Sequence, residues 1–250
     1  MDAVWAALER ALGLYGPGAL AFDADGTLWS GDVGDDLFRW GLEHELFRAP
    51  ALPALQTLAS EHSVALQGNA GLQAQSLFEA FEQGRLPARS AYEMMVWAFA
   101  GWSIQELHLE VDQMLRATNL RERLFEPLGD VIAWARQRAL PCYVVSASPI
   151  FVIERAVRVL GFEPEHLAAG EPMRSSEGII APHLAAPLPY LDHKVDAFRR
   201  IAPGARLLCA FGDSGFDLPL LQTADLAVAV RPKKGLRDEL HRIPRALLLE

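Results

Sequence analysis

The stretch Leu20-Ala21-Phe22-Asp23-Ala24-Asp25-Gly26-Thr27-Leu28-Trp29 decides the fold class of this chain. A short apolar run leads into two aspartates separated by one residue, and a Gly-Thr turn follows. Because side chains alternate along a strand, we expect Asp23 and Asp25 on the same face, near the carboxyl end of a buried strand. Two carboxylates so close repel each other unless a cation or a shared proton compensates. A core strand has no structural use for that pair, so the stretch predicts a functional site.

The composition is that of an ordinary globular protein and excludes several classes. The chain has 250 residues, 51% hydrophobic and 22% charged, which suits one large domain or a core domain with a smaller one attached. The formal net charge of -9 argues against attraction to nucleic acid or anionic membranes. We expect Cys142 and Cys209, both in apolar runs, to be buried free thiols. No leader-like segment or membrane-spanning run is evident, so the expected localisation is cytoplasmic.

Helical patterns replace strand patterns after the first strand and continue to about residue 125. A helix is predicted before that strand, over 2–13. Candidate helices after it span 35–45, 54–65, 72–82, 90–100 and 103–117. Ser103 and Glu106 fit a capping box at the start of the last one. A connection of about ninety residues without structure of its own is rare. We therefore expect an inserted all-α subdomain.

The aromatic side chains of this helical block have two candidate roles. They are Trp40, Phe47, Phe78, Phe81, Tyr92, Trp97, Phe99 and Trp102. A small helical bundle needs such volume for its core, which is the role we expect for most of them. The alternative is an aromatic box for a cationic ligand.

The second half of the chain alternates between helix and strand. Strands are predicted at 141–145, 206–211 and 226–230, the last closing the series, and helices at 127–139, 150–160, 192–201 and 218–223. The region 169–189 is irregular apart from a hairpin turn at Ser175-Ser176-Glu177-Gly178. Such alternation is typical of a parallel sheet covered on both faces. The predicted fold class is α/β, with a Rossmann-like parallel-sheet core.

Polar side chains follow the ends of the predicted strands. Asp23 and Asp25 end the first strand, Ser146 ends the next, and Asp213 and Asp217 follow a third. The carboxyl ends of parallel strands meet at one edge of a sheet, and ligands of such folds bind there. We therefore expect these five side chains to form one site.

This site has the chemistry that phosphoryl transfer requires. Carboxylates around one point, without His or Cys nearby, suit a hard cation such as Mg²⁺. One carboxylate can attack phosphorus, and the other can donate a proton to the leaving group and later take one from water. Lys194, near the start of a predicted helix, and the Ser146 hydroxyl would hold phosphate oxygens, assisted by backbone N–H groups of the following turns. We expect the competing Lys233 and Lys234, in a Pro-Lys-Lys-Gly turn, at the surface.

These motifs resemble those of a known family. Asp23-Ala24-Asp25-Gly26-Thr27-Leu28 resembles the first motif of the haloacid dehalogenase-like (HAD) hydrolases. Ser146, then Lys194, then Gly212-Asp213-Ser214-Gly215-Phe216-Asp217 resemble the second, third and fourth motifs in the right order. The resemblance spans nearly the whole chain, and the first and fourth motifs together are highly specific.

The resemblance implies a role for each site residue. Asp23 would be the nucleophile and a metal ligand, and Asp25 the general acid/base that meets Mg²⁺ through its backbone carbonyl. Asp213 would be the third protein ligand of the metal, and Asp217 would support the metal shell and Lys194. The residues expected to bind the phosphoryl group are Ser146, Lys194, Gly26 and Thr27.

The helical block resembles the type-1 cap of the family and its phosphoserine phosphatase-like subfamily. It would form a cap domain over residues 31–124, and residues 1–30 with 125–250 would form the core domain. In that subfamily an acidic residue nine positions after the nucleophile contacts the substrate amine, and Asp32 occupies that position. Asp32 could instead be a hinge or surface acid. Gly26 replaces the Ser common in phosphoserine phosphatases, which puts phosphoserine in doubt as the substrate.

The sequence therefore predicts Mg²⁺-dependent hydrolysis of a small phosphomonoester through an aspartyl-phosphate. Asp25 favours phosphoryl transfer over carbon–halogen cleavage, because the dehalogenase branch lacks this second aspartate. Two alternatives stay open: a phosphomutase or phosphotransferase with the same intermediate, and a HAD-like binding module without turnover. The expected partner is a small phosphorylated metabolite, with no nucleic acid and no membrane. The sequence does not specify an oligomeric state.

Overall fold

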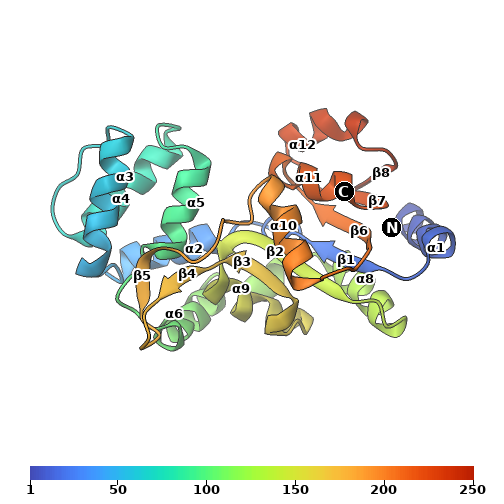
Figure 1. The fold of residues 1–250 in the computed structure, drawn as a ribbon, viewed down its shortest axis with the longest axis horizontal. Coiled ribbons are helices and arrows are strands. Elements are labelled where there is room, and N and C mark those ends of the chain that lie inside the picture. The colour runs from blue at the N-terminus through green and yellow to red at the C-terminus, as the bar shows by residue number, and fades with distance from the viewer.

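A six-stranded parallel sheet forms the centre of the computed structural model, which describes residues 1–250 (Figure 1). In spatial order its strands are β3 (Leu167–Gly170), β2 (Cys142–Pro149), β1 (Ala19–Phe22), β6 (Leu207–Gly212), β7 (Leu226–Val230) and β8 (Ala246–Leu249). All neighbouring strands pair in parallel. The chain builds outward from β1 in one direction and then returns to place β6 on its other side. The carboxyl ends of β1 and β6 therefore flank the switch point where such sheets bind ligands.

Helices cover both faces of this sheet, as predicted. They are α1 (Asp2–Tyr15), α8 (Glu126–Gln137), α9 (Ile150–Ala156), α10 (Asp192–Ile201), α11 (Leu218–Thr223) and α12 (Lys234–Glu239). Leu20 and Phe22 of β1 belong to the hydrophobic cluster that includes α1, α8 and α9, whereas Ala19 and Ala21 face the cluster that includes α10, α11 and α12. Because both faces are buried, β1 is apolar throughout instead of alternating.

Six α-helices lie between β1 and the core helix α8. They are α2 (Val33–Glu43), α3 (Leu52–Glu61), α4 (Ala70–Glu82), α5 (Ala88–Trp97), α6 (Ile104–Ala117) and α7 (Leu120–Arg123). The predicted capping box is present, since Ser103 and Glu106 exchange both of its hydrogen bonds at the start of α6. In Figure 1, α3, α4 and α5 stand together at one end of the molecule, away from the sheet.

The predicted hairpin packs on these helices and not on the sheet. It consists of the antiparallel strands β4 (Pro172–Arg174) and β5 (Ile180–Leu184). The Ile180 N–H donates to the Trp102 carbonyl at 2.8 Å, and the Ile180 carbonyl accepts from the Gly101 N–H at 2.9 Å. The hairpin lies beside α5 in Figure 1. A segment from the second half of the chain is thus joined to the helical segment of the first half.

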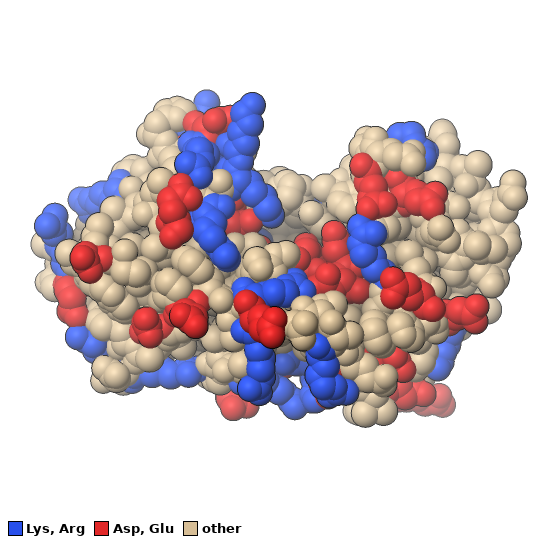
Figure 2. Space-filling view, turned by 180° about the vertical axis from the view of Figure 1, so that it is seen from behind, with Lys and Arg blue, Asp and Glu red and all other residues tan.

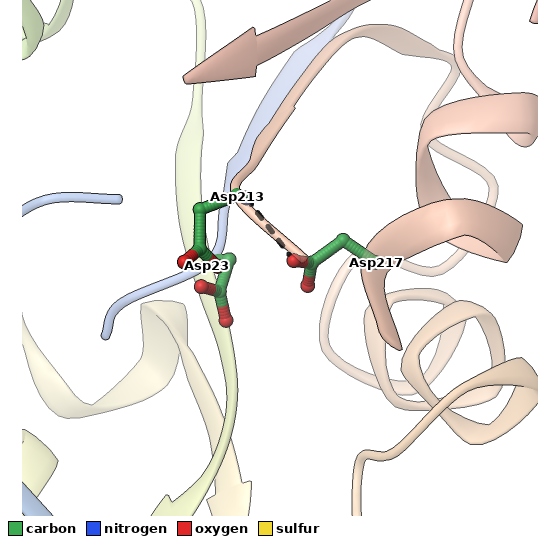
Figure 3. A group of neighbouring side chains, drawn as sticks. All are labelled: Asp23, Asp213 and Asp217. Atoms are coloured by element: carbon green, nitrogen blue, oxygen red, sulfur yellow. Dashed lines mark hydrogen bonds between the residues drawn. The ribbon is translucent and has the colours of Figure 1, made fainter. Parts of the chain in front are cut away.

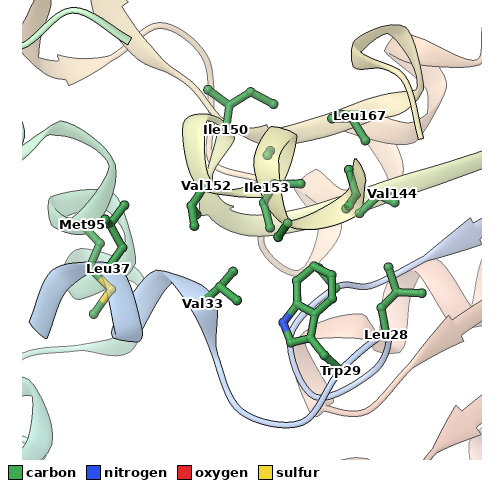
Figure 4. Close-up of a cluster of buried hydrophobic side chains, with 14 of the residues drawn as sticks. Leu28, Trp29, Val33, Leu37, Met95, Val144, Ile150, Val152, Ile153 and Leu167 are labelled. Carbon is green, nitrogen blue, oxygen red and sulfur yellow. The ribbon is translucent and has the colours of Figure 1, made fainter. Parts of the chain in front are cut away.

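A continuous hydrophobic cluster joins the sheet to the helical segment. It includes Leu28, the fully buried Trp29 and Val33, which lead from the first motif into α2. Figure 4 shows this run below the side chains of Val144 in β2 and Ile153 in α9. The passage from β1 to the helices is therefore packed along its length and is not a free linker.

Strand β2 is longer than the predicted strand at 141–145 and continues to Pro149. Ser146 therefore lies within the strand, and the expectation that it ends the strand is wrong. The register with β3 is regular up to Val145 and shifts before Pro149. Ser146 begins the irregular part of β2, where the chain departs from ideal pairing.

Two strands of the sheet are absent from the sequence prediction. Strand β3 overlaps the stretch interpreted as irregular, because Leu-Ala-Ala-Gly carries little strand propensity. Strand β8 follows β7, so the expectation that the strand at 226–230 closes the series is wrong. Its Ala-Leu-Leu-Leu run favours helix by local propensity, and pairing with β7 overrides that preference.

Both cysteines are buried free thiols, as predicted. None of the helices combines the length and the apolar character that a membrane crossing requires.

The packing between the sheet and the helical segment gives a test of the fold. Phe151 of α9 is fully buried, and its ring lies 5.6 Å from that of Phe99. We expect Phe151→Ala to lower the free energy of unfolding by about 3–5 kcal/mol, because it leaves a cavity at this junction. Chemical denaturation measures the loss. Leu109→Ala, at a side chain that is 67% exposed, is the control and should change it by less than about 0.5 kcal/mol.

Candidate active site

The neighbouring ends of β1 and β6 bring three aspartates together. The Asp23 N–H donates to the Phe211 carbonyl at 2.9 Å, which ties the residue after β1 to β6. Carboxylate oxygens of Asp23, Asp213 and Asp217 lie within 4.8 Å of one another, and all three residues are buried. Figure 3 shows the Asp23 and Asp213 carboxylates pointing toward each other, with Asp217 on the following turn.

Lys194 at the start of α10 is held between two of these carboxylates. Its ammonium lies 2.6 Å from Asp23 Oδ1 and 2.5 Å from Asp217 Oδ1, and the side chain is 3% exposed. Burial alone disfavours a charged lysine, but the Asp217 and Asp23 carboxylates raise the pKa of Lys194 above its usual value. The ammonium is therefore a fixed positive charge beside Asp23.

Asp217 uses its carboxylate to hold the turn after β6. Asp217 Oδ2 accepts hydrogen bonds from the Asp213 N–H at 3.2 Å, the Ser214 N–H at 2.9 Å and the Ser214 hydroxyl at 2.9 Å. Asp217 Oδ1 accepts from Lys194. A carboxylate has about four acceptor positions, so these contacts leave Asp217 little capacity for a metal ion and favour a supporting role.

Asp213 has a cation partner that the sequence interpretation missed. Lys233 Nζ lies 2.9 Å from Asp213 Oδ2, and the Lys233 N–H donates to the Asp213 carbonyl at 2.7 Å. The interpretation of Lys233 as a surface residue alone is therefore incomplete, since it also lines the site. Burial raises the pKa of Asp213 despite this contact, and burial and the Asp217 charge raise the pKa of Asp23 well above its usual value.

The Asp25 side chain turns away from this cluster toward the start of α2. Asp25 Oδ1 accepts from Trp29 Nε1 at 2.9 Å and from the Val33 N–H at 2.7 Å. Asp25 Oδ2 lies 2.6 Å from the Ser148 hydroxyl. Because β1 ends at Phe22, the expectation that both aspartates share a strand face is wrong. Burial, and next the charge of Asp32, raise the pKa of Asp25 to about 7.

Gly26 and Thr27 shape the turn and do not line the cavity. Gly26 has φ +80°, and a Cβ there would lie 2.1 Å from Asp213 Oδ2, so a serine would collide with the aspartate. The Thr27 hydroxyl donates to Asp23 Oδ2 at 3.2 Å. The N–H groups of Gly26 and Thr27 donate to carbonyls within the turn, which does not support the phosphate contacts predicted for them. The N–H groups of Ala24 and Asp25 have no acceptor in the protein.

Two serines on the irregular part of β2 face the site. Ser146 is 1% exposed, and its hydroxyl oxygen accepts from the Ser148 N–H at 3.0 Å. Sequence reasoning missed Ser148, whose hydroxyl contacts Asp25. The alternation Ser-x-Ser is the signal that could have found it, since residues two apart share a strand face.

Asp32 is the N-cap of α2 and also lines the site. Asp32 Oδ1 accepts from the N–H groups of Gly34 and Asp35, at 2.8 and 3.0 Å. Asp32 Oδ2 has no hydrogen-bond partner in the protein. Burial, followed by the charge of Asp35, raises the pKa of Asp32 to about 6. Because capping of α2 uses only Oδ1, the Oδ2 atom of Asp32 is available to a ligand.

These side chains line one small cavity of about 60 Å³, which we call the active-site cavity. Three aromatic side chains lie in its wall. Tyr92 is among those for which the sequence left an aromatic box open as an alternative, whereas sequence reasoning gave Tyr190 and Phe216 no such role. The lining residues are Asp23, Asp25, Asp32, Tyr92, Ser146, Ala147, Ser148, Tyr190, Lys194, Asp213, Ser214, Phe216 and Lys233. Seen from behind in Figure 2, the molecule is hollowed between the α3–α5 helices and the α11–α12 side, and acidic side chains gather in the hollow beside a basic one.

The donor set of the cavity fits a hard divalent cation. Asp23 and Asp213 offer carboxylate oxygens, and no His or Cys side chain lines the cavity. Four carboxylates face two ammonium groups in the lining, and burial opposes the charge on Asp23 and Asp213. The site therefore lacks positive charge that a bound cation would supply.

The chain belongs to the haloacid dehalogenase-like hydrolase family. Residues 20–222 match the model of that family, a range that contains the four motifs described above. No curated protein shows significant sequence similarity to this chain.

Solved structures share the fold over nearly the whole chain. A protein of unknown function from Bordetella pertussis Tohama I matches with a TM-score of 0.71 at 22% identity, over 93% of this chain and 97% of that one. A functionally unknown protein from Anaerococcus prevotii DSM 20548 matches with 0.71 at 14% identity, over 96% and 89%. A substrate-bound phosphoserine phosphatase matches with 0.53 at 16% identity, over 91% and 99%. At these low sequence identities, the structural matches show a shared fold alone.

Gly26 gives a test of the site geometry. We expect Gly26→Ala to displace Asp213, which adds about 1–3 kcal/mol of steric cost to the strain of a positive φ, about 1–2 kcal/mol. Gly84→Ala is a matched control, because Gly84 has φ +71° and open space around it. Chemical denaturation compares the two variants. Equal losses of unfolding free energy would contradict the predicted contact with Asp213.

Proposed function

We propose that this chain is a Mg²⁺-dependent phosphatase that hydrolyses a small phosphomonoester through an aspartyl-phosphate at Asp23. The observation that supports it most is the Asp23 carboxylate, buried at a cavity and held by Lys194 and Thr27 beside Asp213. The family of the chain and its shared fold with a phosphoserine phosphatase agree with this proposal. The segment 31–124 would act as the cap.

In the first step an Asp23 oxygen attacks phosphorus and the bond from phosphorus to the ester oxygen breaks. Lys194 and the Ser146 hydroxyl hold phosphoryl oxygens, because they are donors in the same cavity. Asp25 donates a proton to the departing ester oxygen, and the contacts from Trp29 and Ser148 keep its carboxylate in position.

In the second step water attacks the phosphorus of the aspartyl-phosphate. Asp25 takes a proton from that water, the bond between Asp23 and phosphorus breaks, and inorganic phosphate leaves. Asp23, Asp213 and the Asp25 carbonyl would hold Mg²⁺, which neutralises charge on the phosphoryl oxygens when bound. The cavity is small, at about 60 Å³, which favours a small metabolite over a polymer as substrate.

The test is release of inorganic phosphate from p-nitrophenyl phosphate and a panel of phosphomonoesters. We expect turnover with Mg²⁺ and its loss when EDTA removes the metal. Asp23→Asn should lower kcat by about 10³-fold or more, because the nucleophile is lost, and Asp25→Asn by about 10²-fold or more.

Asp130→Asn, at an exposed site on α8, is the matched control and should retain the wild-type rate. Circular dichroism checks that each variant is folded. Absence of phosphate release by the wild-type protein from every ester would overturn the phosphatase proposal. Phosphoryl transfer to a second hydroxyl without phosphate release would instead identify a phosphotransferase.

A further inference from the structure

Three aromatic rings from separate segments meet at the wall of the active-site cavity. Tyr92 comes from α5, Tyr190 from the loop before α10, and Phe216 from the turn after β6. The ring centroids of Tyr190 and Phe216 are 4.6 Å apart, and Tyr92 lies 6.0 Å from Tyr190 and 6.2 Å from Phe216. All three rings are half-buried. The phosphoryl chemistry proposed above uses none of them, so they are available to the rest of the substrate.

The charge beside these rings is negative. Asp32 lines the same cavity with one carboxylate oxygen that has no partner. Burial, and next the charges of Asp32 and Asp35, raise the pKa of the Tyr92 phenol above its usual value. The wall therefore combines aromatic surface with anionic charge.

The cavity has no spare cation for a negatively charged substituent. Its only basic side chains are Lys194 and Lys233. Lys194 is bonded to Asp23 and Asp217, and Lys233 to Asp213. Arg89 lies near Tyr190, but it is outside the lining and is paired with Glu93 at 2.9 Å. A substrate carboxylate, such as that of phosphoserine, would thus meet Asp32 and aromatic rings without an unpaired partner of opposite charge.

We propose that the substrate is a phosphomonoester of an amino alcohol whose nitrogen is methylated, with the cationic head group against Tyr92, Tyr190, Phe216 and Asp32. This inference rests on the proposed phosphatase function and specifies its substrate class. A methylated ammonium is weakly hydrated and spreads its charge over its methyl groups, so it suits aromatic faces better than a primary ammonium does. The carboxylate of Asp32 supplies the opposite charge.

The packing of the rings also indicates how such a ligand would enter. The rings contact one another in this structure, and Tyr92 is the one carried by the helical segment. A displacement of α5 away from Tyr190 and Phe216 would open the space between the rings to a cationic group. The same three side chains would therefore close the cavity and recognise the substrate.

Binding to a variant without turnover tests the inference directly. Isothermal titration calorimetry of Asp23→Asn with Mg²⁺ compares phosphocholine, phosphoethanolamine and phosphoserine. We expect phosphocholine to bind about tenfold or more tightly than phosphoserine, and more tightly than phosphoethanolamine. Adding Tyr92→Leu should remove most of the preference for phosphocholine over phosphoethanolamine, whereas Tyr92→Phe should keep it because the aromatic face remains. A merely structural defect would weaken both ligands alike and leave their ratio unchanged.

Two further variants sharpen the comparison. Asp32→Asn keeps a good helix N-cap but removes the charge, so it should weaken phosphocholine by about tenfold and phosphoserine less. Tyr15→Leu, at a half-buried tyrosine of α1 outside the cavity, should leave the ratio of affinities unchanged.

The outcomes separate this inference from the phosphatase proposal. Phosphate release from p-nitrophenyl phosphate together with phosphoserine bound as tightly as phosphocholine would overturn the inference and leave the phosphatase intact. An unchanged preference in the Tyr92→Leu variant would overturn it as well. Failure of the phosphatase proposal would appear differently, as absence of phosphate release by the wild-type protein from every ester.

Discussion

The structure depends on one buried ion network, in which Lys194 lies between Asp23 and Asp217. A buried ammonium needs charged partners, and removing Lys194 would leave the carboxylates of Asp23 and Asp217 uncompensated in the interior. The two contacts connect positions that are 171 and 23 residues apart in the chain. One side chain therefore fixes the end of β1, the start of α10 and the turn after β6 relative to one another. The orientation of Asp23 follows from this network.

The charges of the site bear on how an acidic protein would accept the anionic substrate of the proposed function. The chain has a formal net charge of -9. The cavity itself is lined by more carboxylates than ammonium groups. Lys194 and Lys233 are bonded to aspartates and cannot alone reverse the local field. Under the proposed function, positive charge would arrive with a bound cation, so metal binding and phosphate binding would depend on each other.

Much of the site follows from the sequence because parallel sheets bring strand ends to one edge. Asp23 and Asp213 need only that topology to meet, and their strands are clear apolar runs. Lys233 and Tyr190 lie in loops without periodicity, so only the tertiary structure reveals that they line the cavity. Strands β3 and β8 escaped prediction for a similar reason, because pairing with a neighbour and not local propensity decides their conformation. The side-chain direction of Asp25 likewise depends on its contacts with Trp29, Val33 and Ser148, which lie outside β1.

The hairpin of β4 and β5 changes the mechanics of the helical segment. An inserted segment with two connections to its host can rotate about many axes. Here the chain passes between the two parts four times, because residues 172–184 return to pack on Trp102 and α5. The last of these passages leads within a few residues to Tyr190 and Lys194. A displacement of α5 would therefore be transmitted along the chain segment that carries Tyr190 and Lys194, so the helical segment and one wall of the cavity are mechanically coupled.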